Sequence, residues 1–311
     1  GAGSAVCSSG LRFPLASCIG ASAGLGWPGL SQLKPDLLGG AKKQSVKPAL
    51  SDKWAMGGTY EDFMGRWSRL LAPRFVSWLA VRPSANWLDV GCGTGALADA
   101  ICVAASPASV VACDPSEPFI EYARRRQVDP RVSFVVARVG HLPTRPGGFD
   151  SVTSLLALNF FPEPAAAIDE MRQLVAADGL VSACVWDYAR RMEFLRCFWD
   201  SVGGMDPSAA ALDEGRRFPI CRPDALESLF REGGLTDVVC DSIEIPTRFS
   251  TFADYWKPFL GGTGPAPSYV ASLDPPRREA LAARLERSLP REPDGAISLA
   301  ARAWVVRGVA R

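Results

Sequence analysis

The stretch Trp87-Leu-Asp-Val-Gly-Cys-Gly-Thr-Gly-Ala96 decides the fold of this chain. Its first four residues are mostly apolar and predict a short buried strand, which stops at Gly91, Gly93 and Gly95. An apolar pattern with helical spacing begins at Ala96. Because glycine has no side chain, a ligand can lie directly against the backbone of such a strand-to-helix turn. The stretch therefore predicts a strand, a ligand-binding turn and a helix in succession.

Two acidic residues accompany the turn. Asp89 lies two residues before the first glycine, and Asp114 ends a second apolar run, nineteen residues beyond Gly95. An ionised carboxylate only accepts hydrogen bonds, and the two hydroxyls of a ribose are donors, so Asp114 predicts a nucleoside ligand. The spacing Gly91-x-Gly93-x-x-Ala96 also fits a dinucleotide fingerprint, which leaves a nicotinamide cofactor as an alternative.

Apolar runs with strand and helix patterns alternate after the turn. We expect strands near 86–90, 109–113, 132–136, 149–157 and 180–186. Such alternation predicts a parallel α/β sheet with helices on both faces. Two late extended runs, 236–248 and 297–306, are joined without a regular crossover and fit an antiparallel end of the sheet. This late pair argues against a nicotinamide dehydrogenase, which would continue with parallel units.

Composition limits the classes of function. The chain has 311 residues, is 48% hydrophobic and carries a net charge of +1. This size allows one large core, and the near-neutral charge gives no attraction to nucleic acid or to an anionic membrane. The nine cysteines form no CxxC pair, so we expect free thiols in a reducing cytoplasm and no metal site. No apolar window is long enough to span a membrane.

The first part of the chain differs from the rest. Residues 1–50 are rich in Gly, Ser, Ala and Leu and carry five basic residues and one acidic residue. We expect 1–55 to be a disordered leader, either an organelle-targeting segment or sequence upstream of a start at Met56. Residues 56–311 are expected to form one domain. Its lid helix is expected at 57–80, and substrate-side insertions at 188–222 and 250–290.

Three segments resemble one family. Leu88-Asp-Val-Gly-Cys-Gly-Thr-Gly95, followed by Asp114, resembles motif I of the class I S-adenosylmethionine-dependent methyltransferases. Tyr60-Glu-Asp-Phe-Met-Gly-Arg-Trp-Ser68 resembles the segment before motif I in a bacterial-type small-molecule branch, and Phe160-Phe-Pro-Glu-Pro164 resembles the turn after its fourth strand. The resemblance covers Gly57 to Arg311. It implies a Rossmann-like sheet of seven mostly parallel strands with an antiparallel last strand, and S-adenosylmethionine as cofactor.

The resemblance also implies a cofactor site. Its residues would be Tyr60, Arg66, Asp89, Gly91, Cys92, Gly93, Gly95, Asp114, Pro115, Ser116, Arg138, Val139, Asn159 and Phe160. One position departs from the family: Arg138 stands where an acidic residue usually accepts a hydrogen bond from the adenine amino group, and arginine cannot accept one. Loss of that contact would cost about 1–3 kcal/mol of binding, although the backbone of Val139 could still contact adenine.

The reaction implied by this family needs little acid–base chemistry. A sulfonium methyl group is already electrophilic, and holding an acceptor in line can supply about 7–11 kcal/mol. A base is needed only for a hydroxyl of high pKa, and the candidates are Asp187 and His141. Aromatic residues in 252–259 are expected to form either an apolar acceptor pocket or the core of the insertion that carries them.

We therefore expect a methyltransferase that acts on a small organic acceptor, as a monomer or homodimer, with no nucleic-acid or membrane partner. The alternative, motivated by Arg138, is a methyltransferase-like protein that binds a nucleoside without turnover. An NAD-dependent oxidoreductase is less favoured.

Overall fold

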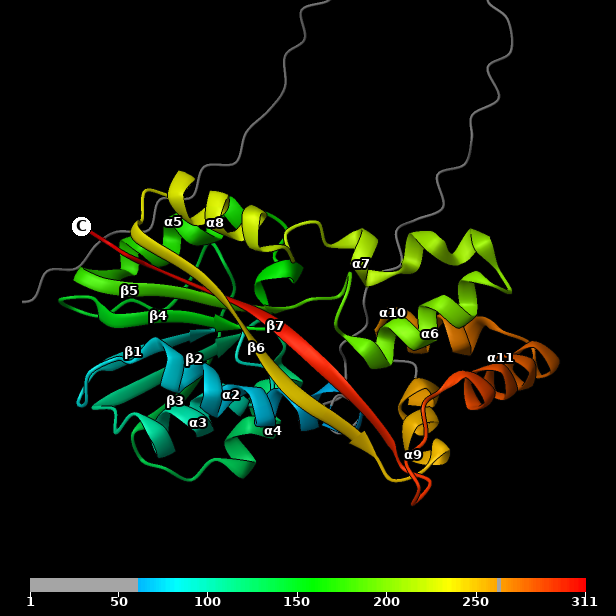
Figure 1. Ribbon diagram of the computed structural model, residues 1–311. Helices are drawn as coiled ribbons and strands as arrows, with labels where there is room; N and C mark the ends of the chain where they lie inside the picture. Colours follow the sequence, from blue (N-terminus) through cyan, green and yellow to red (C-terminus); the bar gives the residue numbers. More distant parts are fainter. Residues whose placement is uncertain (1–60, 262–263) are drawn as a thin grey trace, which may run out of the picture. The chain divides into compact units, whose positions relative to one another are not determined.

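Seven strands form one sheet in the order β3-β2-β1-β4-β5-β7-β6 (Figure 1). The computed structural model describes residues 61–261 and 264–311. The strands are β1 (Asn86–Val90), β2 (Ser109–Asp114), β3 (Val132–Val136), β4 (Phe149–Leu155), β5 (Val175–Trp186), β6 (Thr236–Phe249) and β7 (Ile297–Val309). Strands β1 to β5 pair in parallel, whereas β7 is antiparallel to both β5 and β6. The predicted fold class is confirmed.

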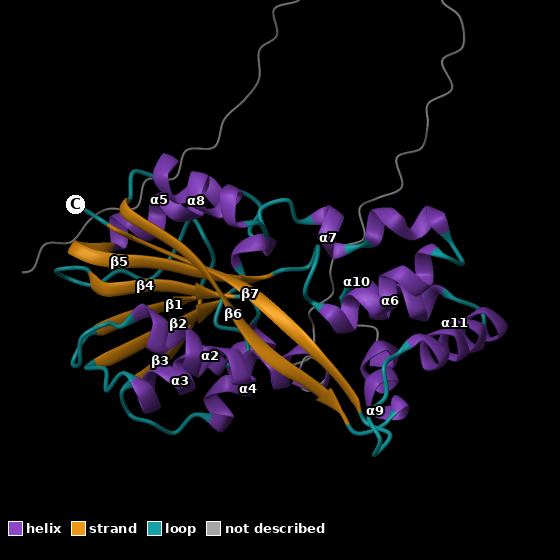
Figure 2. Ribbon diagram, in the orientation of Figure 1, coloured by secondary structure: helices purple, strands orange, loops and turns teal. Residues whose placement is uncertain are grey.

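Helices cover both faces of the sheet (Figure 2). One face is covered by α2 (Arg66–Leu79), α3 (Ala96–Ala104) and α4 (Glu117–Arg126), and the other by α5 (Pro164–Leu174) and α8 (Pro223–Glu232). The central strand β1 is buried on both sides from Trp87 to Val90, which explains its nearly continuous apolar run. The carboxyl ends of the parallel strands meet at one edge of the sheet.

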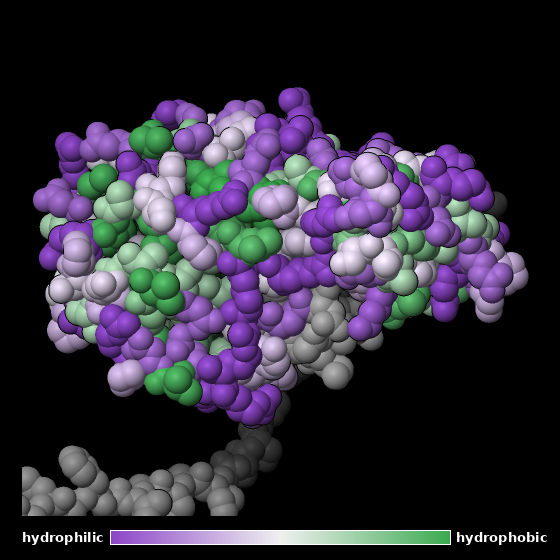
Figure 3. Space-filling view, turned by 60° about the horizontal axis from the view of Figure 1, so that its bottom comes forward, coloured by the Kyte–Doolittle hydropathy of each residue, from purple (hydrophilic) through white to green (hydrophobic). Residues whose placement is uncertain are grey.

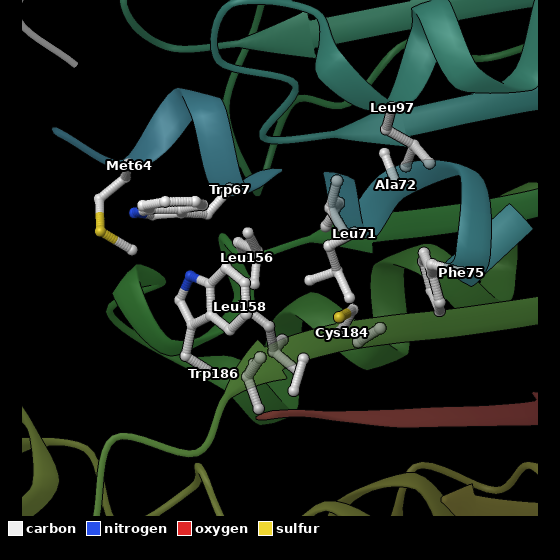
Figure 4. Close-up of a cluster of buried hydrophobic side chains, with 14 of the residues drawn as sticks. Met64, Trp67, Leu71, Ala72, Phe75, Leu97, Leu156, Leu158, Cys184 and Trp186 are labelled. Atoms are coloured by element: carbon white, nitrogen blue, oxygen red, sulfur yellow. The ribbon is translucent and has the colours of Figure 1, made fainter. Parts of the chain in front are cut away.

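The lid segment is a π-helical turn, η1 (Glu61–Gly65), that runs on into α2. The sequence pattern predicts a second helix beginning at Pro73, but α2 continues through this proline. Pro73 lies on the exposed side of α2, so the helix keeps its buried stripe and gives up only one backbone hydrogen bond. Figure 4 shows part of that stripe, with Leu71 and Phe75 among the buried side chains of the core.

The connection from α5 to β5 also differs from the prediction. The sequence predicts a strand only from 180, but α5 ends at Leu174 and β5 starts at once at Val175. The pairing of β4 with β5 shifts between Phe149 and Ser151, and Asp178 adopts a positive φ of 61°. A bulge of this kind absorbs the extra residues, and a helix-period pattern gives no sign of it.

Two insertions follow the parallel strands. The first holds α6 (Glu193–Gly203), η3 (Pro207–Leu212) and α7 (Glu214–Arg217), and the second holds α9 (Phe252–Trp256), η4 (Lys257–Gly261), α10 (Pro265–Ser272) and α11 (Pro275–Ser288). The long β6–β7 hairpin carries the second insertion at its far end (Figure 1).

The lid and both insertions share an aromatic cluster. The ring of Phe63 in the lid lies 5.6 Å from that of Phe194 and 5.8 Å from that of Phe259, and Phe198 stacks on Phe259 at 4.6 Å. Tyr255 also packs here, fully buried. Of the two expectations for the aromatic residues of 252–259, an acceptor pocket or the core of the insertion, the structure shows the core.

Some expectations fall outside the described residues, among them the leader at 1–55 and Tyr60. Of the helices that the structure describes, none combines the length and apolar character needed to cross a bilayer. Figure 3 shows hydrophilic and hydrophobic residues interspersed over one face of the molecule.

Candidate active site

A cavity of about 410 Å³ opens at the carboxyl ends of the parallel strands. Ligands of open α/β sheets bind at this edge, and the volume suits a small molecule. The lining comes from the lid, from the glycine turn, and from the segments that follow β2, β3, β4 and β5. Its members are Met64, Ser68, Asp89–Thr94, Ala96, Leu97, Asp114–Ser116, Phe119, Ala137–Val139, Leu142, Leu155–Ala157, Phe160–Pro162, Trp186 and Tyr188.

Backbone hydrogen bonds from the glycine turn hold it against β2. The N–H groups of Gly91 and Cys92 both donate to the carbonyl oxygen of Cys113, at 2.8 and 2.9 Å. A Cβ on Gly91 would lie 2.4 Å from the Cβ of Ala157, whereas a Cβ on Gly93 would meet nothing within 4 Å. Gly91 therefore lets two elements pack closely, and Gly93 leaves open space for a ligand.

Asp114 completes the turn from the end of β2. Its two carboxylate oxygens accept hydrogen bonds from the backbone N–H groups of Gly93, at 3.0 Å, and Ser116, at 2.8 Å. Burial raises the pKa of this carboxyl, and the two backbone donors partly oppose the shift. Because each carboxylate oxygen can accept a second hydrogen bond, Asp114 keeps capacity for the hydroxyls of a ribose.

Asp89 lies beneath the turn with a carboxylate that has no partner among the described residues. Its side chain is 0% exposed, lines the cavity, and accepts no hydrogen bond from any described residue. Burial raises its pKa well above the ordinary range, and the nearby charge of Asp114 adds to the shift. A buried carboxylate without a donor is costly, and a cationic ligand group would remove that cost. The amino group of a methionine moiety fits this requirement.

A hydrogen-bond network fastens the lid to the glycine turn. The Glu61 carboxylate accepts from the Arg69 guanidinium, at 3.0 and 3.1 Å, and from the Thr94 hydroxyl. Arg69 also donates to Asp99 of α3 at 2.7 Å. Burial opposes ionisation of Glu61, but these donors outweigh it and lower its pKa. The sequence reasoning missed this network because its members lie far apart in the chain.

The predicted lid residue Arg66 does not line the cavity. Its guanidinium donates to Asp254 of α9 at 2.9 Å and to the carbonyl oxygen of Arg248 at 3.1 Å. It also lies over the rings of Trp67 and Phe249, at 4.1 and 4.6 Å from their centroids. Arg66 thus joins the lid to the second insertion, on the side away from the cavity.

Neither predicted base lies in the cavity. Successive strand residues point to opposite faces, and Trp186 and Tyr188 face the cavity while Asp187 between them does not. The Asp187 carboxylate is buried and accepts from the guanidinium of Arg302 on β7, at 2.6 and 3.0 Å. His141 lies exposed in a turn.

The other predicted cofactor residues divide into two groups. Cys92, Pro115, Ser116, Arg138, Val139 and Phe160 line the cavity. Gly95 instead begins α3 with a φ of 88°, close to the ring of Phe134. Asn159 is buried outside the lining, and neither polar atom of its side chain has a partner among the described residues.

The end of the cavity at β4 and β5 is apolar. It is formed by Met64, Leu155, Leu156, Ala157, Phe160, Phe161, Trp186 and Tyr188. Figure 4 shows Met64 of η1, Leu156 just after β4 and Trp186 of β5 in the same cluster of buried side chains. Of the described lining residues at this end, none carries a carboxylate, an amine or an imidazole. The sequence reasoning missed most of this wall, although the alternation at 186–188 could have revealed part of it.

Comparison with known proteins agrees with this geometry. Residues 88–183, from β1 into β5, match a family described as a methyltransferase domain. A demethylmenaquinone methyltransferase of Clavibacter sepedonicus is 40% identical over 98 residues, covering 31% of this chain and 39% of the relative. A ubiquinone biosynthesis O-methyltransferase of Azotobacter vinelandii is 40% identical over 100 residues, covering 30% and 41%.

A third relative matches over a longer stretch. The nocamycin O-methyltransferase of Saccharothrix syringae is 25% identical over 255 residues, covering 75% of this chain and 88% of the relative. The first two matches span less than half the length of those relatives. The family match, the glycine turn with its two acids and the order of the strands lead to one conclusion: residues 88–183 of this chain form a methyltransferase domain.

Proposed function

We propose that this protein transfers the methyl group of S-adenosylmethionine to a small organic acceptor with an apolar skeleton. One observation carries the proposal: a single cavity joins a nucleoside-type site at β1 and β2 to an apolar chamber at β4 and β5. A cofactor held at the nucleoside-type site would direct its sulfonium methyl group into the apolar chamber. The chamber in this proposal consists of the eight residues named above, from Met64 to Tyr188.

Residues of this chain would hold the cofactor by four contacts. Asp114 would accept hydrogen bonds from the ribose, and Asp89 would pair with the amino group of the methionine moiety. Gly93 would let the ligand approach the backbone, and Met64 of the lid would lie against it. The bound cofactor supplies a sulfonium whose methyl group is electrophilic. The protein's own task is to hold the acceptor in line and to exclude water.

The acceptor in this proposal ionises without help from the protein. The described chamber walls offer no carboxylate or imidazole as a base, while Asp187 is held by Arg302. Attraction between a cationic sulfonium and an anionic nucleophile is stronger in an apolar chamber than in water, and the transfer cancels both charges. A phenol or an enol meets these conditions. Two of the relatives are named as O-methyltransferases, which supports oxygen as the acceptor atom.

Titration calorimetry tests the cofactor half of the proposal. We expect S-adenosylhomocysteine to bind and NAD not to compete with it. Asp114→Asn should weaken binding about tenfold or more, because a charged acceptor is lost. Asp169→Asn is the matched control, since Asp169 is exposed on α5. Preferential binding of NAD would favour the oxidoreductase alternative instead.

Mass spectrometry tests the transfer itself. The protein is incubated with S-adenosylmethionine and a panel of phenols and enols, and methylated product and S-adenosylhomocysteine are both measured. We expect equal amounts of the two, and a rate that follows the ionisation of each acceptor. Tight cofactor binding without transfer to any member would favour the alternative of nucleoside binding without turnover.

A further inference from the structure

The β3 side of the cavity forms a slot of its own. Its walls are Pro115, Phe119, Val139 and Leu142, which are apolar and lie beyond Asp114. In the sheet, β2 lies between β3 on one side and β1 on the other, and the apolar chamber is further along at β4 and β5. A ribose held at Asp114 with its reactive sulfur toward the chamber must direct its base toward β3. The slot is therefore the place for the purine.

Arg138 stands at this slot with an unused guanidinium. Within the described lining of the cavity it is the one cationic side chain, and it makes no hydrogen bond or ion pair with another described residue. The two carboxylates of that lining, Asp89 and Asp114, belong to the glycine turn. The slot thus offers a purine side-chain donors but no side-chain carboxylate or amide oxygen.

The backbone around Arg138 is fixed. The N–H of Ala137 donates to the carbonyl oxygen of Asp114 at 3.2 Å, and the N–H of His141 donates to that of Arg138 at 2.9 Å. Glu170 of α5 accepts from the N–H groups of Gly140 and Leu142, at 2.5 and 2.9 Å. The Glu170 carboxylate is therefore occupied by the backbone of this loop.

We propose that Arg138 reads position 6 of the purine and favours an acceptor there over an amino group. A guanidinium only donates, so it meets the amino group of adenine as donor against donor. The oxygen at position 6 of hypoxanthine, together with N7, matches the paired donors of arginine, as in the arginine–guanine contact of nucleic-acid recognition. This inference rests on the proposed function, since it requires the slot to hold the nucleoside of the cofactor.

The proposal concerns binding, and calorimetry tests it without turnover. Dissociation constants are measured for S-adenosylhomocysteine and S-inosylhomocysteine, which differ at position 6. We expect the protein to bind the inosyl ligand at least as tightly as the adenosyl ligand. In Arg138→Asp a carboxylate replaces the guanidinium, and the preference should move toward the adenosyl ligand by about tenfold.

Arg145→Asp is the matched control. Arg145 lies in the same connection between β3 and β4 but near Ser109, at the start of β2 and away from the cavity. This variant should leave the ratio of the two dissociation constants unchanged. Because the ratio in the unmodified protein is informative by itself, the test does not depend on the folding of any variant.

Each outcome decides between the two proposals. A tenfold or greater preference of the unmodified protein for the adenosyl ligand would overturn the role of Arg138 and leave the proposed function standing. An unchanged ratio in folded Arg138→Asp would do the same. If neither ligand binds the unmodified protein at millimolar concentration, the proposed function fails first, and the inference about Arg138 fails with it.

Discussion

The two ends of the cavity are built in different ways. At the nucleoside end, Asp89, the glycine turn and Asp114 lie within 26 consecutive residues, and backbone N–H groups set their geometry. At the chamber end, side chains from the lid, β4, the turn after it and β5 form an apolar wall. Under the proposed function, a contiguous backbone motif would recognise the cofactor. Recognition of the acceptor would instead depend on the packing of distant segments.

Gly91→Ala gives the largest expected effect and tests whether the nucleoside end depends on its backbone. The new Cβ would lie 2.4 Å from that of Ala157, at a positive φ of 77°. Overpacking and backbone strain together should lower the free energy of unfolding by about 2–6 kcal/mol, measured by denaturant titration. Gly93→Ala is the control: it adds strain without a clash, so it should impair ligand binding more than stability. Equal losses of stability would contradict this division.

Glu214 tests whether the first insertion, which follows the chamber residue Tyr188 in the chain, has its own response to pH. This residue of α7 is 3% exposed, accepts a hydrogen bond from the indole of Trp199, and has a pKa that burial raises to about 7. The folded state therefore binds its proton more tightly than the unfolded state, whose pKa is near 4.5. Stability should fall as the pH rises from 4.5 to 7, by about 3 kcal/mol from this group.

Glu214→Gln isolates that contribution. The glutamine keeps the shape and an acceptor for Trp199 but does not titrate. The difference in unfolding free energy between the two proteins should therefore change with pH across this window. A difference that is constant from pH 4.5 to 7 would show that the side chain ionises as it does in water.

Asp89→Asn sharpens the comparison at the nucleoside end. Because its pKa is raised, the folded state without ligand binds the Asp89 proton more tightly than the unfolded state does. The folded state therefore loses stability as the pH rises from the ordinary pKa of 3.8 through the higher pKa of the folded protein. Asparagine should remove this loss, so the variant without ligand should be at least as stable at pH 8. Binding of S-adenosylhomocysteine should weaken about tenfold or more. Weaker stability together with unchanged binding would assign Asp89 a structural role.

Asp187→Asn gives the smallest expected effect. It tests whether a residue next to the chamber, but outside its lining, affects stability without affecting methyl transfer. The variant keeps an acceptor for Arg302 but loses the charge, so unfolding should become easier by about 1–2 kcal/mol. The pH profile of methyl transfer should stay the same, because this side chain does not reach the cavity. If the variant no longer showed a fall in rate at low pH, Asp187 would be restored as the catalytic base.

The sequence predicted local features well. The bounds of β1 and β3 and the arrangement of the turn follow from periodicity and from glycine, which act over a few residues. Contacts between distant segments were beyond such reasoning. Arg66 was assigned to the cofactor, but its partner Asp254 lies 188 residues away. For the aromatic residues after β6 the sequence left an acceptor pocket and a core both open, because apolar side chains of the two look alike in sequence.

The lid has a consequence for protein engineering. Its first turn is anchored on two sides, through Glu61 to the glycine turn and through Phe63 to rings of both insertions. An exchange of the substrate-side helices between relatives would leave Phe63 facing a surface that it does not fit. The module to be grafted therefore includes the lid together with the two insertions, although some 130 residues of sequence separate its parts.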